Sequence, residues 1–147
     1  MRANRYDGAM DSGRNFSGVW ELDLERSTLR GDPPVRILIK IDHAEPKLVE
    51  EAHVTRKDGS ESSMVFHIDT SGRETVHGIG RSQARWIGQE LLIESWVEIN
   101  DRKLHFKDYW SLSADGETLA MEHRDDELAG QITVLRRQTS AKGAENE

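Results

Sequence analysis

The strongest constraint on this sequence is an alternation of apolar and polar residues with a period of two. Successive side chains of a β-strand point to opposite faces, so the alternation predicts strands that bury one face. No long stretch has the apolar spacing of a helix, which excludes folds that alternate strands with helices. The segments with this pattern are Gly18–Leu24, Val35–Asp42, Lys47–Lys57, Ser62–Asp69, Ser82–Ile87, Leu91–Asn100, Lys103–Ser113, Thr118–Asp125 and Gln131–Gln138.

Turn residues separate these segments. Asp58-Gly59 and Asp115-Gly116 tolerate the positive φ angles of tight hairpins, and Pro33-Pro34 ends the one segment with helical character, 25–30. The glycine-rich segment 77–81 is expected to form a mobile loop over an open end. Closure removes the exposed edges of a sheet, so we expect an all-β fold, a single antiparallel up-and-down β-barrel of about eight to ten strands. A two-sheet sandwich is the alternative.

The length and composition suit one domain. A chain of 147 residues buries enough apolar surface to form a stable core without disulfide bonds. Residues 1–15 and 139–147 are polar and aperiodic, which predicts a disordered leader and tail around a barrel at 16–138. The chain has no cysteine, which excludes disulfides and thiolate metal ligands. It also fits a reducing compartment, so we expect a cytoplasmic protein.

Charge and hydropathy exclude two classes of partner. The chain has 20 Lys and Arg against 27 Asp and Glu, a net charge of −7, which disfavours nucleic acid. No apolar run approaches the roughly 20 residues that span a bilayer, so no membrane is expected. The six histidines lack metal-binding spacings, and neither a metal nor a cofactor is expected. The alternative is a metal site formed by residues of different strands, around His123, Asp108 and Glu50.

The first predicted strand carries a recognisable motif. Phe16 to Asp23 contains Gly18-Val19-Trp20, and this segment resembles the first strand of lipocalin-like (calycin) β-barrels. In that family an arginine near the end of the last strand packs across the tryptophan, so the resemblance implies Arg136 or Arg137 as the partner of Trp20. It also implies a cup for small, mostly apolar ligands, with a minority of members acting as enzymes. The long helix that true lipocalins place before the last strand is not visible here.

Alternation also assigns the residues that face the interior. The more apolar face of each strand is expected to point inward. Trp96 falls on the opposite face, between Glu94 and Glu98, and there it suggests a contact in a homodimer. The candidate ligand-binding residues on the inward faces are Glu50, Met64, Phe66, Trp86, Ile93, Phe106, Trp110 and Met121.

The turn at Asp115-Gly116 sets the register of the strands that flank it. Pairing Leu112 with Leu119 across this turn places Asp108 opposite His123. A carboxylate on an apolar face is costly to bury without a partner, and His123 supplies one.

The preceding turn, at Asn100-Asp101, extends this polar row. Pairing Ile99 with Leu104 places Ser95 opposite Asp108. The sequence therefore predicts Ser95, Asp108 and His123 side by side within an apolar wall.

This polar row has three interpretations. Asp108 and His123 form a structural pair, or they anchor a ligand, or they act as a catalytic acid and base, with Ser95 as a hydrogen-bond donor or nucleophile. The first function hypothesis is the binding of a small hydrophobic or amphipathic molecule inside the barrel. The alternative is a small barrel enzyme, an isomerase, cyclase or hydrolase, that uses the Asp/His pair.

Overall fold

The structure, a computed structural model, describes residues 14–78, 80–125 and 130–138. Residues 1–13 of the expected leader and the expected tail at 139–147 lie outside these ranges. Asn15, which the sequence pattern assigned to the leader, contacts the barrel: its Nδ2 donates to the carbonyl of His43 at 3.0 Å.

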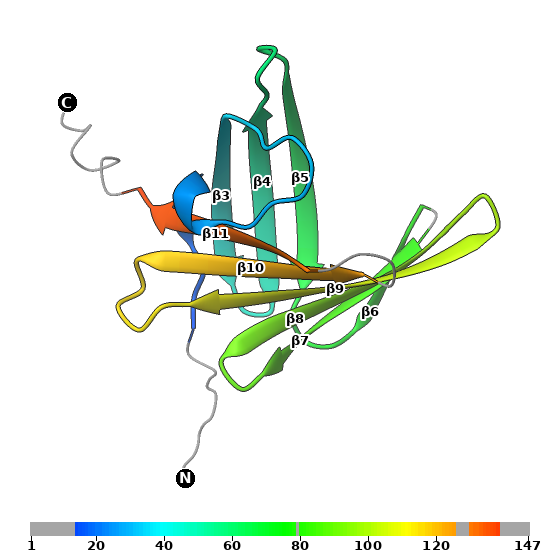
Figure 1. The fold of residues 1–147 in the computed structure, drawn as a ribbon. Helices are drawn as coiled ribbons and strands as arrows, with labels where there is room; N and C mark the ends of the chain where they lie inside the picture. The colour runs from blue at the N-terminus through cyan, green and yellow to red at the C-terminus, as the bar shows by residue number, and fades with distance from the viewer. Residues whose placement is uncertain (1–13, 79, 126–129, 139–147) are drawn as a thin grey trace, which may run out of the picture.

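One antiparallel sheet of ten strands makes up the fold (Figure 1). Its order is β5-β4-β3-β2-β11-β10-β9-β8-β7-β6, so consecutive strands pair with each other except β5 and β6, and β11 returns to β2. In Figure 1 the strands β3 to β5 run across the direction of β9 and β10, as in a strongly curved barrel wall. The strands are β2 (Gly18–Leu22), β3 (Arg36–Ala44), β4 (Lys47–Thr55), β5 (Glu61–Asp69), β6 (Glu74–His77), β7 (Gly80–Ile87), β8 (Glu90–Ile99), β9 (Arg102–Leu112), β10 (Thr118–Asp125) and β11 (Gln131–Arg137).

This architecture confirms the predicted all-β, up-and-down barrel and rules out the sandwich. The segment with helical character forms only a short 3-10 turn, η1 (Leu24–Arg26). No helix in the described ranges has the length and apolar character that a membrane crossing requires. The barrel is nearly closed: β5 and β6 are the two edges of the sheet, and no strand ladder joins them. We call the opening between them the gap.

One end of the barrel is tightly packed, and we call this end the floor. Its side chains come from the segment before β2 and from strands all round the barrel, so their apolar faces converge there. The residues with 0% exposed area are Phe16, Trp20, Leu48, Leu91, Leu119 and Leu135.

The first-strand motif closes the floor. The Arg137 guanidinium lies 4.4 Å from the centre of the Trp20 ring, which is cation–π geometry. Its Nη1 also donates to the carbonyl of Ser17 at 2.9 Å. A Cβ on Gly18 would lie 2.5 Å from that Nη1, and the φ of Gly18 is +143°. Glycine is therefore required where the chain passes the arginine, and Arg137 is the partner of Trp20. Arg136 instead points outward.

The sequence pattern missed β6. This strand has only four residues, and it lies beside the glycines that suggested a loop. In the structure Val76 pairs with Arg81, so most of the expected loop belongs to the hairpin of β6 and β7. Ile79 lies outside the described residues.

The predicted register of β8 and β9 was wrong by two residues. Ile99 lies opposite Arg102, so the turn contains only Asn100 and Asp101. Both have positive φ, at 51° and 63°, as the tightest two-residue hairpin demands. Ser95 therefore lies opposite Phe106 and not opposite Asp108. A shift of two keeps the inward faces unchanged, because side-chain direction repeats every second residue.

Candidate ligand-binding site

Beyond the floor, the interior is lined by side chains that solvent still reaches, and we call this region the open half. On one wall, Met64 pairs with Ala52 and Phe66 pairs with Glu50, so both large side chains of β5 face inward. Met64 is nevertheless 50% exposed and Phe66 45% exposed. Both belong to an edge strand beside the gap, where no neighbouring strand covers them. Large apolar surface therefore faces the interior without being buried.

The opposite wall is formed by β8, β9 and β10. Ile93 lies opposite Asp108, and the Phe106 ring lies 5.4 Å from the His123 ring. Met121 packs against the core cluster. All of these side chains are only partly buried. The structure thus places Met64, Phe66, Ile93, Phe106 and Met121 of the predicted set on inward faces, as the alternation indicated.

Two predicted ligand contacts, Trp86 and Trp110, lie beside the floor. The Trp86 ring stacks on Phe16 at 5.7 Å with an interplanar angle of 4°. The Trp110 ring meets Phe16 edge-on at 5.6 Å and is buried. Their contact with a ligand stays a prediction. Because both rings pack against Phe16, they lie where the floor meets the open half.

The predicted contact between Asp108 and His123 is present. The register across Asp115-Gly116 is the one predicted, and Nδ1 of His123 lies 2.7 Å from Oδ1 of Asp108. Both side chains remain about 30% exposed, at 28% for His123 and 30% for Asp108. Desolvation raises the pKa of Asp108, while the hydrogen bond and the charge of His123 act in the opposite direction. The pair is thus an accessible, inward-facing polar group.

The pair belongs to a longer chain of charges that the sequence did not reveal. Nε2 of His123 lies 3.5 Å from Oδ2 of Asp125, and the same oxygen accepts from Nη2 of Arg30 at 3.3 Å. Arg30 belongs to the loop after η1, and its position relative to β10 follows from loop conformation, which alternation does not encode. Ser95 does not join this chain, because the shorter β8–β9 turn moves it opposite Phe106.

Glu50 is the other ionisable group of the predicted set. It is only 9% exposed, and it pairs with the buried Ile41 on one side and Phe66 on the other. Burial, followed by the negative charge of Asp108, raises its pKa from 4.5 to about 7. Both residues lie on the inward faces of their strands, so the charge of Asp108 acts on Glu50 within the barrel.

A buried histidine, His43, lies near the end of β3, one residue beyond the strand that the sequence predicted. Its Nδ1 accepts the backbone N–H of Phe16 at 3.1 Å, and its Nε2 lies 2.5 Å from Oε2 of Glu45. The ring also lies nearly parallel to the rings of Phe16, at 5.7 Å, and Trp86, at 6.1 Å. Both nitrogens therefore have partners, and His43 stabilises the floor.

Within 14–78, 80–125 and 130–138, no three His, Asp or Glu side chains are grouped so that they could hold a metal ion. The alternative site around His123, Asp108 and Glu50 is therefore not formed.

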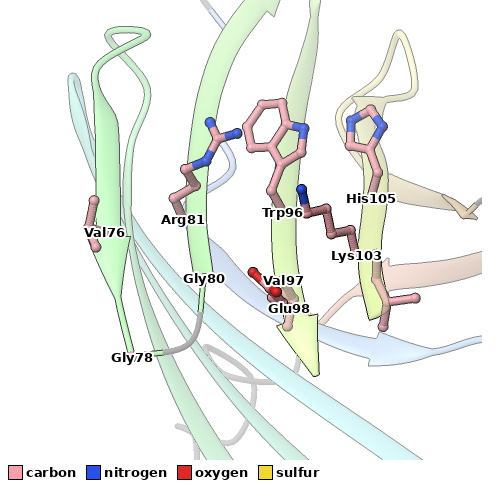
Figure 2. A pocket seen from close by; sticks show the side chains of 10 residues that line it. Val76, Gly78, Gly80, Arg81, Trp96, Val97, Glu98, Lys103 and His105 are labelled. Atoms are coloured by element: carbon pink, nitrogen blue, oxygen red, sulfur yellow. The ribbon is translucent and has the colours of Figure 1, made fainter. Parts of the chain in front are cut away.

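The outer face of β6 to β9 carries a separate depression of about 610 Å³ (Figure 2). Trp96 lies at its centre, with the Arg81 guanidinium 4.5 Å from its ring and the His105 ring stacked on it at 5.1 Å. Figure 2 shows the three side chains projecting from the same side of the sheet. Glu94 accepts from Nη1 of Arg85 at 3.0 Å and lies 2.9 Å from His105. Trp96 thus faces outward as expected, and the homodimer contact stays a prediction.

No family model matches this chain, and no curated protein matches it. Solved structures do. The fluorescent protein UnaG is 12% identical with a TM-score of 0.60, covering 84% of this chain and 97% of UnaG. Secretory abundant heat soluble protein 4 of Ramazzottius varieornatus is 12% identical with a TM-score of 0.56, covering 88% and 99%. Fatty-acid-binding protein 1 of Echinococcus granulosus is 11% identical with a TM-score of 0.54, covering 83% and 96%.

These likenesses span almost the whole of each solved structure. At such low identity they establish the fold and leave the ligand open. Together with the contact between Trp20 and Arg137, they show that the chain has the lipocalin-like β-barrel fold that its sequence predicted.

Proposed function

We propose that this protein binds a small, largely apolar molecule inside the open half of its barrel. The observation that carries the proposal is the half-exposed state of Met64 and Phe66, whose side chains face inward. Apolar surface left in contact with water favours a ligand that covers it, by about 25 cal/mol for each Å² removed from water. The polar groups Asp108, His123 and Glu50 are the few that would fix the orientation of such a molecule.

The fold relatives support the same reading. One of them is named as a fatty-acid-binding protein, and its barrel covers 83% of this chain. The chain contains no cysteine, which supports the cytoplasm as the compartment that we propose for it.

The experiment is a titration with Nile red, a neutral dye whose fluorescence rises in an apolar site. Met64→Glu places a charge in the open half and is expected to weaken binding at least roughly tenfold, because the dye must then share the site with an ion. Val65→Glu is the matched control, since Val65 is the next residue of β5, is 56% exposed and faces outward. Equal binding by both variants, or no binding by the unmodified protein, would contradict the proposal.

The short contact between Asp108 and His123 supports a second candidate function, a small enzyme that uses them as acid and base. Its test follows the chemical fate of a bound compound. Turnover that Asp108→Asn abolishes, at an unchanged unfolding midpoint, supports this function. Recovery of every bound compound unaltered after long incubation contradicts it.

A further inference from the structure

Glu50 differs from the other interior carboxylates because it has no partner. Asp108 is hydrogen-bonded to His123, and Asp125 is paired with Arg30. Within the described ranges, no group forms a hydrogen bond or ion pair with the Glu50 carboxyl, although the residue is nine-tenths buried. Its oxygens are not among the fully buried atoms that lack a partner, so they remain accessible, but a carboxylate with so little contact with water is one that a bound cation would stabilise.

The surroundings of Glu50 do not supply that cation. The neighbouring strands β3 and β5 place Ile41 and Phe66 beside it. Across the interior, β9 contributes Asp108, a second negative group, and its charge acts on Glu50. The basic side chains of this region, His123 on β10 and Arg30 on the loop after η1, already face Asp108 and Asp125.

We propose that the ligand of the open half is an amphiphile with a protonated amine, whose ammonium group pairs with Glu50 while its apolar body covers Phe66 and the inward face of β9. The inference rests on the function proposed above and names the chemical class of its ligand. A carboxylate ligand would instead meet Glu50 and Asp108, two groups of its own sign.

The test compares three ten-carbon amphiphiles that differ only in the head group: decylamine, decanol and decanoate. Each displaces Nile red from the unmodified protein at pH 8, where Glu50 is ionised. We expect decylamine to bind at least roughly tenfold more tightly than decanol, and decanoate to bind more weakly than either. The preference for decylamine falls at pH 6, because the pKa of Glu50 is about 7 and the carboxyl is then mostly protonated.

Two variants assign the preference to one carboxyl group. Glu50→Gln is expected to remove the advantage of decylamine over decanol. Glu51→Gln is the matched control: Glu51 is the next residue of the same strand, faces outward and contacts His53. It removes the same charge from the outer face, so we expect the preference to persist.

The outcomes separate this inference from the proposed function. Binding of decanol without any advantage for decylamine overturns the inference alone, and so does an advantage that survives in Glu50→Gln. Tighter binding of decanoate also overturns it and points to Arg30, whose Nη1 is buried without a hydrogen-bond partner. Failure of all three compounds and of Nile red to bind overturns the proposed function as well.

Discussion

The floor and the open half are built from the same strands, yet the side chains that they turn inward have different surroundings. Phe16 and Phe66 are chemically identical, but Phe16 is fully buried and Phe66 is 45% exposed. Phe16 lies where the segment before β2 crosses the barrel end, among Trp86, Trp110 and His43. Phe66 lies on the edge strand beside the gap. The comparison shows that position relative to the edges of the sheet, and not residue type, decides whether an inward-facing side chain is buried.

The largest expected effect is on stability at the floor. Trp20→Ala removes a fully buried ring together with its cation–π contact, and we expect it to lower the free energy of unfolding by about 3–5 kcal/mol. Phe66→Ala removes a half-exposed ring and is expected to cost less than about 1 kcal/mol. Urea denaturation of both variants measures the difference. Comparable losses at the two positions would contradict the division into two ends.

The next effect concerns Glu50 and depends on pH. Its pKa is 4.5 in the unfolded chain and about 7 in the folded protein, so the folded state retains the proton between these values. Stability contributed by the protonated group is therefore fully present below pH 4.5 and is lost as the pH rises to about 7. The loss is about 3 kcal/mol at most.

Glu50→Gln removes this dependence, because glutamine does not titrate. The free energy of unfolding of this variant, relative to the unmodified protein, should rise by up to about 3 kcal/mol between pH 4.5 and pH 8. Urea denaturation at a series of pH values measures the rise. Glu51→Gln, which changes the outer face, should show no such trend, and a flat difference for Glu50→Gln would show that its carboxyl is solvated.

A smaller effect sharpens the account of the floor. Arg137→Lys keeps the charge but loses the planar contact with Trp20 and the geometry of the bonds to the Ser17 and Gly116 carbonyls. We expect a loss of about 1–2 kcal/mol in thermal or urea unfolding. Arg136→Lys, on the same strand but facing outward, should cost less than about 0.5 kcal/mol. Similar losses for the two arginines would contradict the role assigned to Arg137.

Much of the fold was predictable because it depends on local signals. The alternation of apolar residues specified nine of the ten strands, and the Asp115-Gly116 turn specified the register that brings Asp108 to His123. The error at Asn100-Asp101 arose because the sequence marks the turn but does not fix its length. The strand Glu74–His77 was missed because four residues are too few to show a period.

The environment of the site was less predictable than its residues. Alternation placed Met64 and Phe66 on the inner face, but their exposure depends on the gap, which is a property of the whole sheet. The pairing of Arg30 with Asp125 joins a loop to a strand 95 residues away, and no local pattern encodes it. The same holds for His43, whose partners come from the segment before β2 and from the turn that follows β3.

The most direct test of the central claim is to map where an apolar ligand binds. Backbone amide shifts of the labelled protein, followed by NMR during titration with decanol, report which strands contact it. We predict perturbations on β5 around Met64 to Phe66 and on the facing parts of β9 and β10 around Phe106 and His123, with little change at Leu119 in the floor. Perturbations confined to the outer face around Trp96, or an absence of any, would contradict the account.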